Sequence, residues 1–235
     1  AGQLDTISPS PQVVSTLPGS AIIDKAPRNI LNFLYFDPES YKANKPPFND
    51  DRVRRAFSRA IDRDALLAIA SPDGGKWANL PITPGFSEFW WLDPQGSEIG
   101  KAGDNYKFDI AEAKALFSAA GVDSIDVPMH YSSNVYNNAV PFYETVRQTL
   151  PNMLKEAGVT VNPVPEEYFS VYISQTFNGQ FDGGFALGLE SVFSDAGSYW
   201  AGMFYDRAAG GIRNHSSVAD EDLRAKIKSM LELQD

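Results

Sequence analysis

The sequence contains no cysteine and only two histidines in 235 residues, and its 20 Lys+Arg are outnumbered by 30 Asp+Glu. The absence of cysteine excludes disulfides, thiolate metal sites and thiol nucleophiles. His130, which we interpret as an edge-strand residue, and His215 lie far apart in the chain, so a zinc site would need carboxylates for most of its ligands. The net charge of −10 argues against binding to a phosphate backbone. We therefore expect neither a metal site nor a nucleic-acid partner.

Long apolar runs and phosphate-binding glycine patterns are also missing. No stretch approaches the roughly 18 consecutive apolar residues that span a membrane. The glycine pairs at 183–184 and 210–211 form neither GxGxxG nor GxxxxGK[ST], so we expect no nucleotide cofactor. No GxSxG pattern marks a serine nucleophile.

The composition, with 43% hydrophobic and 12% aromatic residues, is typical of a folded globular protein. At this length a compact chain buries roughly 70–75% of its unfolded surface, so its core needs no disulfide or metal. The chain opens on Ala1 rather than Met and has no signal peptide. We interpret it as a piece of a longer protein.

Changes in hydrophobic period divide the chain into alternating strands and helices. Strands are predicted at residues 29–36, 125–131, 159–161 and 181–187, and helices at 51–70, 109–120, 141–157, 166–177 and 220–233. The strand–helix–strand segment 125–161 predicts two parallel strands, and Pro151 should kink or split the helix between them. Arg63 is predicted mainly on the polar face of its helix. The pattern predicts an α/β (mixed α+β) fold, with a mixed sheet flanked by helices in a single lobe over residues 1–235.

Two groups of side chains are candidates for chemistry or binding. Glu166, Glu167, Glu190 and Asp195 could act as the paired carboxylates of a glycosidase-like hydrolase, but with 30 acidic residues the spacing does not distinguish catalysis from surface charge or helix capping. Four aromatic rings lie in the predicted loop between residues 71 and 109 and could cover the core or stack on a ligand; they are Phe86, Phe89, Trp90 and Trp91.

A stretch at residues 46–64 carries a family resemblance. It reads PPFNDDRVRRAFSRAIDRD and resembles the signature of the family 5 extracellular solute-binding proteins of ABC importers, which bind dipeptides, oligopeptides or nickel. Further matches follow in the family's order: YKFD at 106–109, LKEAGV at 154–159 and GQFD at 179–182. The resemblance covers essentially the whole chain. We interpret Arg54 and Asp62 of the signature as structural residues.

The resemblance implies a periplasmic-binding-protein-like lobe. The chain would be the C-terminal ligand-binding lobe of a two-lobe protein, with the first lobe and a final return segment absent. Such a protein works outside the membrane, in the periplasm or as a cell-surface lipoprotein. It captures a peptide or another small solute in a cleft between its lobes and delivers it to the permease of an ABC transporter, without catalysis.

The family pattern also places candidate ligand contacts. Phe169, Ile173 and Thr176 match cleft positions on one helix, and Gly188, Glu190 and Val192 match the segment after the following strand. In peptide-binding members an Asp at the position of Val192 pairs with the α-ammonium of the peptide. Valine offers no charge, so a buried ammonium would be left unpaired.

Two interpretations of this departure remain open. Glu190 would share a face with Val192 in an extended segment and could replace the aspartate. Alternatively the ligand is not a peptide, and a sugar could stack on aromatic rings such as Trp90 and Trp91, with Asn134 and Asn137 as hydroxyl partners. Ordinary packing of these residues, in an interaction domain that binds no small molecule, is a further alternative.

Overall fold

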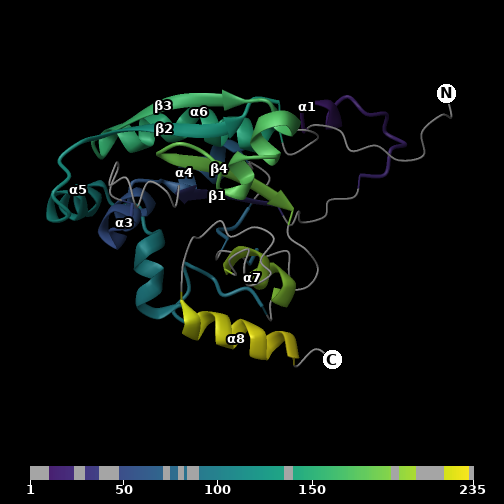
Figure 1. The fold of residues 1–235 in the computed structure, drawn as a ribbon. Coiled ribbons are helices and arrows are strands. Elements are labelled where there is room, and N and C mark those ends of the chain that lie inside the picture. Colours follow the sequence, from purple (N-terminus) through teal and green to yellow (C-terminus); the bar gives the residue numbers. More distant parts are fainter. Residues whose placement is uncertain are drawn as a thin grey trace.

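Four strands form one mixed sheet in the computed structural model (Figure 1). The structure describes residues 11–23, 30–36, 48–70, 75–78, 82–83, 90–134, 140–191, 196–204 and 220–232. The strands are β1 (Ile30–Phe36), β2 (Ile125–Ser132), β3 (Val159–Glu166) and β4 (Phe185–Ser191), in the spatial order β1-β4-β2-β3. Strand β2 runs parallel to β3 and β4, whereas β1 is antiparallel to β4. The predicted α/β fold with a mixed sheet is confirmed.

The predicted parallel unit is present, but its helix is not split. Helix α6 (Val140–Glu156) connects β2 to β3 and contains Pro151. Its buried side chains Val146, Leu150 and Leu154 pack into the core. This packing holds the helix together across the one backbone hydrogen bond that proline removes, so Pro151 does not split the helix; a kink there, the other predicted outcome, stays a prediction.

The family signature forms two helices instead of the predicted one. Helix α3 (Asp51–Arg59) ends at Ala60, and α4 (Arg63–Ala70) begins after a short break. The carboxylate of Asp62 accepts a hydrogen bond from the Ala65 N–H at 2.9 Å, which caps the start of α4. The Arg54 guanidinium donates to the Phe48 carbonyl. Both contacts fit the structural role that we predicted for Arg54 and Asp62.

The remaining described helices are α1 (Pro11–Val14), α5 (Ile110–Ala119), α7 (Ala196–Phe204) and α8 (Glu221–Glu232), with a 3₁₀ segment η1 (Gly100–Tyr106). Asp109 caps α5 by accepting from the Glu112 N–H at 2.9 Å, and Gly121 follows its end with a φ of 74°. The helices predicted at 109–120 and 220–233 are thus confirmed. Within the described segments, no helix combines the length and apolar character needed to cross a membrane.

The region after β3 differs from the prediction. The predicted helix 166–177 consists of the last residue of β3, a π-helix η2 (Tyr168–Ile173) and a 3₁₀ turn η3 (Thr176–Asn178). Strand β4 begins at Phe185 rather than at 181 because Gly183 and Gly184 form a turn with φ values of 73° and 69°. A Cβ on Gly184 would lie 2.0 Å from the Pro128 carbonyl oxygen, so only glycine fits there.

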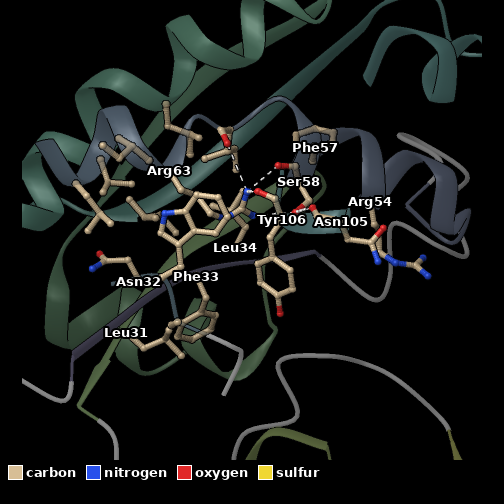
Figure 2. A pocket seen from close by; sticks show the side chains of 18 of the residues that line it. Leu31, Asn32, Phe33, Leu34, Arg54, Phe57, Ser58, Arg63, Asn105 and Tyr106 are labelled. Atoms are coloured by element: carbon tan, nitrogen blue, oxygen red, sulfur yellow. Dashed lines mark hydrogen bonds between the residues drawn. The ribbon is translucent and has the colours of Figure 1, made fainter. Parts of the chain in front are cut away.

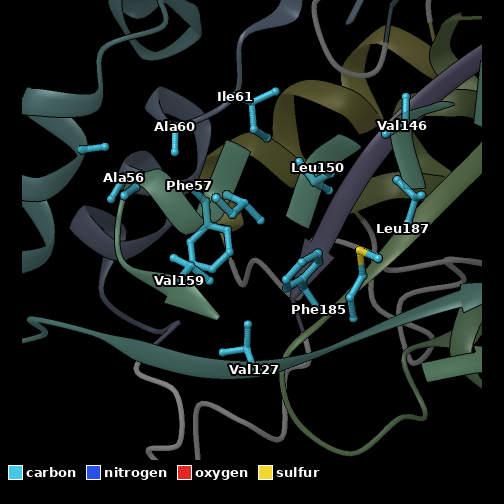
Figure 3. Close-up of a cluster of buried hydrophobic side chains, with 14 of the residues drawn as sticks. Ala56, Phe57, Ala60, Ile61, Val127, Val146, Leu150, Val159, Phe185 and Leu187 are labelled. Carbon is cyan, nitrogen blue, oxygen red and sulfur yellow. The ribbon is translucent and has the colours of Figure 1, made fainter. Parts of the chain in front are cut away.

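Hydrophobic side chains cover both faces of the sheet. One face packs against α3 to α6 in a cluster that includes Phe57, Val127 and Phe185 (Figure 3). The other face carries Leu31, Phe33 and Tyr35 of β1, which pack against residues of η2, η3 and α7. This second face leads to the candidate site.

Candidate functional site

The carboxyl ends of β2, β3 and β4 meet at one edge of the sheet because the three strands are parallel. Ligands of open α/β sheets bind in the crevice outside the carboxyl ends of the strands. Asn134 follows β2, Glu167 and Phe169 follow β3, and Glu190 lies near the end of β4. We call these four positions the carboxyl-end site.

Asn134 and Glu167 together hold the start of η2. The Asn134 side-chain oxygen accepts from the Tyr168 N–H at 3.0 Å, and its amide group donates to Glu167 Oε1 at 3.3 Å. Glu167 Oε2 accepts from the backbone N–H and the hydroxyl of Ser170 at 2.6 and 2.7 Å. The hydrogen bonds from Ser170, and then the one from Asn134, lower the pKa of Glu167 to about 2. Asn134, predicted to meet a ligand hydroxyl, therefore has a structural partner as well.

Phe169 presents an aromatic ring at this edge. Its side chain is 65% exposed, and its ring meets the Tyr168 ring edge-on with 4.9 Å between centroids. Tyr168 in turn stacks on the buried Tyr172 ring at 6.3 Å. A row of rings thus runs from the core to the surface, and its outermost ring, that of Phe169, is open to solvent.

A buried polar cluster lies beneath η2 and was not predicted. His130 Nδ1 is 2.7 Å from Glu166 Oε1, and the Thr176 hydroxyl donates to Glu166 Oε2 at 2.5 Å. The Thr176 carbonyl accepts from the Tyr35 hydroxyl at 3.1 Å. Strand β2 lies between β4 and β3, so the prediction that His130 belongs to an edge strand was wrong. The sequence did carry a signal for this cluster, because polar residues in otherwise apolar parallel strands need buried hydrogen-bond partners.

Thr176 and Gly188, both predicted as ligand contacts, are packed inside the lobe. Thr176 is 1% exposed and bonds to Glu166. A Cβ on Gly188 would lie 2.5 Å from Phe33 Cζ, so the absence of a side chain there serves the packing of that ring. Ile173 is half-buried against the cluster on the same face. Whether any of them also meets a ligand stays a prediction.

Three buried tyrosines around the sheet are held as neutral hydrogen-bond donors. Tyr172 and Tyr143 both donate to the Leu187 carbonyl, at 2.6 and 3.1 Å. Burial raises the pKa of Tyr35, Tyr143 and Tyr172 above the usual value for tyrosine. Their hydroxyls therefore stay protonated and tie η2 and α6 to β4.

The other predicted contacts lie elsewhere or outside the described residues. The Trp91 indole N–H donates to the Trp77 carbonyl at 3.2 Å, and Lys76 Nζ lies 4.7 Å from its ring centroid. Trp91 therefore contacts the segment after α4, whereas Phe169 belongs to η2. Trp90 is 43% exposed. In the β1–β4 register Glu190 pairs with Leu31; Asn137, Val192 and Asp195 lie outside the described residues, as do Phe86, Phe89 and His215.

The geometry gives no support to paired carboxylates. Glu166 is buried and bonded to His130 and Thr176, and Glu167 caps η2, so both carboxylates hold the structure. Among the described residues, no group of three or more His, Asp or Glu side chains is arranged to hold a metal ion. The edge combines an exposed ring with ordered polar groups, which suits binding of a small solute.

A sheet of this order with a binding edge at its strand ends is the architecture of a solute-binding lobe. Residues 1–211 match the model of the bacterial extracellular solute-binding proteins, family 5. The chain belongs to this family, which confirms the resemblance of its PPFND…AIDRD segment.

Relatives with known names cover only part of the chain. It is 27% identical over 134 residues to a protein of Brucella ovis named as an ABC transporter peptide-binding protein, which is 57% of this chain and 22% of that protein. It is 28% identical over 119 residues to the dipeptide-binding protein DppE of Bacillus subtilis, or 49% of this chain and 20% of DppE. The chain thus matches about a fifth of the length of these relatives.

Solved structures share the fold over most of the chain. HbpA2 of Haemophilus parasuis matches with a TM-score of 0.67 and 20% identity, covering 88% of this chain and 38% of HbpA2. A periplasmic oligopeptide-binding protein of Thermotoga maritima, solved with mannohexaose, matches with a TM-score of 0.62 and 19% identity, covering 86% of this chain and 38% of that protein. The predicted periplasmic-binding-protein-like fold is therefore confirmed.

Proposed function

We propose that this chain is the C-terminal lobe of a two-lobe solute-binding protein that captures a small solute for an ABC importer. The observation that carries the proposal is the family match over residues 1–211, together with a fold whose strand ends present Phe169 at one edge. A lobe of this kind supplies one wall of a cleft, and a second lobe closes over the ligand and expels water. The coverage of about two fifths of the related structures supports this division.

Binding without catalysis is the activity that the geometry favours. Members of the family are solute-binding proteins. Glu166 and Glu167 are engaged by structural partners, which argues against these two carboxylates as an acid–base pair. The protein would act outside the membrane, as its family's description indicates, and its macromolecular partner would be the permease of an ABC transporter.

A peptide or another small solute with a polar, partly flat surface fits the edge. Two relatives carry the names of peptide-binding proteins, and the Thermotoga maritima neighbour was solved with an oligosaccharide. The exposed Phe169 ring can stack on a sugar or pack against a peptide side chain. For a peptide, Glu190 is the proposed partner of the α-ammonium, since Val192 carries no charge.

The test is a thermal-shift screen of the complete two-lobe protein with short peptides, their N-acetylated forms and oligosaccharides. A ligand present at 100 times its Kd should stabilise the protein by about 2.7 kcal/mol. Phe169→Ala should abolish the shift, whereas Phe108→Ala, which removes a half-exposed ring before α5, should not.

The two ligand classes give different results. If the ligand is a peptide held by Glu190, acetylation of its amino group and Glu190→Gln should both weaken binding. If the ligand is a sugar, both peptide forms should fail to shift the melting temperature. A protein that no solute stabilises, or in which Phe169→Ala and Phe108→Ala have equal effects on the ligand shift, would contradict the proposal.

A further inference from the structure

A cavity lies beside β1 and shares no lining residue with the carboxyl-end site. Its volume is about 510 Å³, which lies within the range of small-molecule sites. Its walls come from β1, α3, α4, α6, β4, η1 and the segment 76–78 (Figure 2). The largely buried rings of Phe33, Phe57 and Trp77 are among the residues that line it, and most of the lining is apolar.

The charge around this cavity is opposite in sign to that of the whole chain. Arg54, Arg63 and Lys76 line it, and none of the described lining residues is an Asp or a Glu. This is unexpected for a sequence with 30 acidic and 20 basic residues. The hydrogen bonds of Arg54 and Arg63 to described residues go to uncharged acceptors only. The charge of Arg54 is partly offset by Asp50, whereas no described carboxylate acts on Arg63. Arg63 is therefore the cation without a counter-ion from the described chain.

Arg63 provides free donors inside the cavity. Its Nη1 donates to the carbonyls of Ser58 and Tyr106, both at 2.9 Å, and its Nη2 donates to the Ser58 hydroxyl at 2.8 Å. A guanidinium has five N–H groups. The Nε–H and the second Nη2 hydrogen consequently have no acceptor among the described residues, and such a pair suits the two oxygens of a carboxylate.

Burial of this cation has a measurable consequence. Desolvation lowers the pKa of Arg63 to about 10, because no carboxylate among the described residues offsets it. The prediction that Arg63 lies mainly on the polar face of its helix was wrong. The break between α3 and α4 turns its guanidinium toward Ser58 and Tyr106 instead.

Asn32 places its side-chain amide in the same wall. Its Oδ1 is buried and has no hydrogen-bond donor among the described residues, which costs free energy. Rotation of the amide would turn its N–H donors toward an anion, because O and N of this group differ little in shape.

We propose that this cavity binds a small carboxylate with an apolar, aromatic body. Arg63 holds the carboxylate through its free N–H groups, with the Asn32 amide as a further donor. Lys76, an exposed residue of the lining, attracts the anion. The body of the ligand packs against Phe33, Phe57 and Trp77. This site is independent of the proposed transport ligand.

The test is a titration of the 235-residue chain with 3-phenylpropionate and with its neutral amide, 3-phenylpropionamide. Binding is followed by calorimetry and by tryptophan fluorescence, since Trp77 lines the cavity. The carboxylate should bind saturably, and the amide about tenfold more weakly because it lacks the charge. Asn32→Asp places a carboxylate in the wall and should abolish binding of the anion. Lys76→Gln should weaken it, and Lys228→Gln, an exposed cation of α8, should leave it unchanged.

Each other outcome overturns the proposal. It fails if neither compound binds saturably, if the amide binds as tightly as the carboxylate, or if Asn32→Asp folds and retains the affinity. Equal effects of Lys76→Gln and Lys228→Gln would mean that only the overall charge of the chain matters. If Asn32→Asp does not fold by circular dichroism, the comparison of the two exposed lysine variants decides. None of these results depends on the carboxyl-end site, whose test uses Phe169→Ala.

Discussion

Gly188→Ala tests whether this glycine is required by packing in the core. Phe33 and Gly188 lie opposite each other in the β1–β4 register, and an added Cβ would lie 2.5, 2.7 and 2.8 Å from three atoms of the Phe33 ring. Ordinary contact begins at 3.4 Å, so the ring would have to move by about 1 Å. The Phe33 side chain is 7% exposed and packs beside Tyr35 at 5.6 Å between centroids, so moving the ring disturbs a packed contact.

Overpacking of this kind costs about 1–3 kcal/mol. For a chain of this size the melting temperature should fall by roughly 2–4 °C for each kcal/mol, which calorimetry and urea unfolding can measure. Phe33→Leu makes room, so in the Gly188→Ala background it should cost less than it does alone, with a coupling of about 0.5–3 kcal/mol. Unchanged stability in Gly188→Ala, or strict additivity of the two substitutions, would refute the packing argument. Lost ligand affinity at unchanged stability would favour a direct ligand role for Gly188.

Three further predictions concern the segments around η2. Hydrogen bonds lower the pKa of Glu167 from 4.5 to about 2, so this carboxylate stabilises the fold above about pH 4.5 and loses that effect as the pH falls toward 2. In Glu167→Gln the midpoint of urea unfolding should therefore depend less on pH over this range. Gly184→Ala should destabilise more than Gly183→Ala by about 1–3 kcal/mol in urea unfolding, since both have positive φ but only Gly184 meets a carbonyl oxygen at 2.0 Å. Glu166→Ala leaves two buried groups, His130 and Thr176, without their partner and should cost roughly 2–5 kcal/mol in the same measurement. Glu166→Gln should cost less, because the amide oxygen can still accept one hydrogen bond. Equal losses in the two variants would contradict the role of Glu166 in the buried polar cluster.

Local sequence patterns were sufficient for several of the regular elements. The apolar run of β1, the parallel unit around α6 and the Asp109 cap of α5 each follow from residues near one another in the chain. These signals are local because hydrogen bonds in helices and caps join residues only a few positions apart. At Pro151 the local rule predicts a disrupted helix, but α6 continues through it because its buried face packs against the core.

The interior of the candidate site depends on contacts that no local pattern encodes. His130 and Glu166 lie on neighbouring strands, and the order of those strands decides that they meet. Arg63 has the spacing of a surface residue, but the break before α4 turns it inward. The exposed position of Phe169 likewise depends on a π-helix, which the helical period of the sequence did not distinguish from an α-helix.

The adjacent carboxylates Glu166 and Glu167 explain how η2 is held. Neighbouring residues of an extended segment point to opposite sides. Glu166 therefore points into the lobe and bonds to His130 and Thr176, while Glu167 points outward and bonds to Asn134 and Ser170. The same alternation that rules them out as a catalytic pair anchors η2 from both sides. The backbone on which Phe169 sits is thereby anchored to the sheet, and under the proposed function this would reduce the freedom lost when a ligand binds.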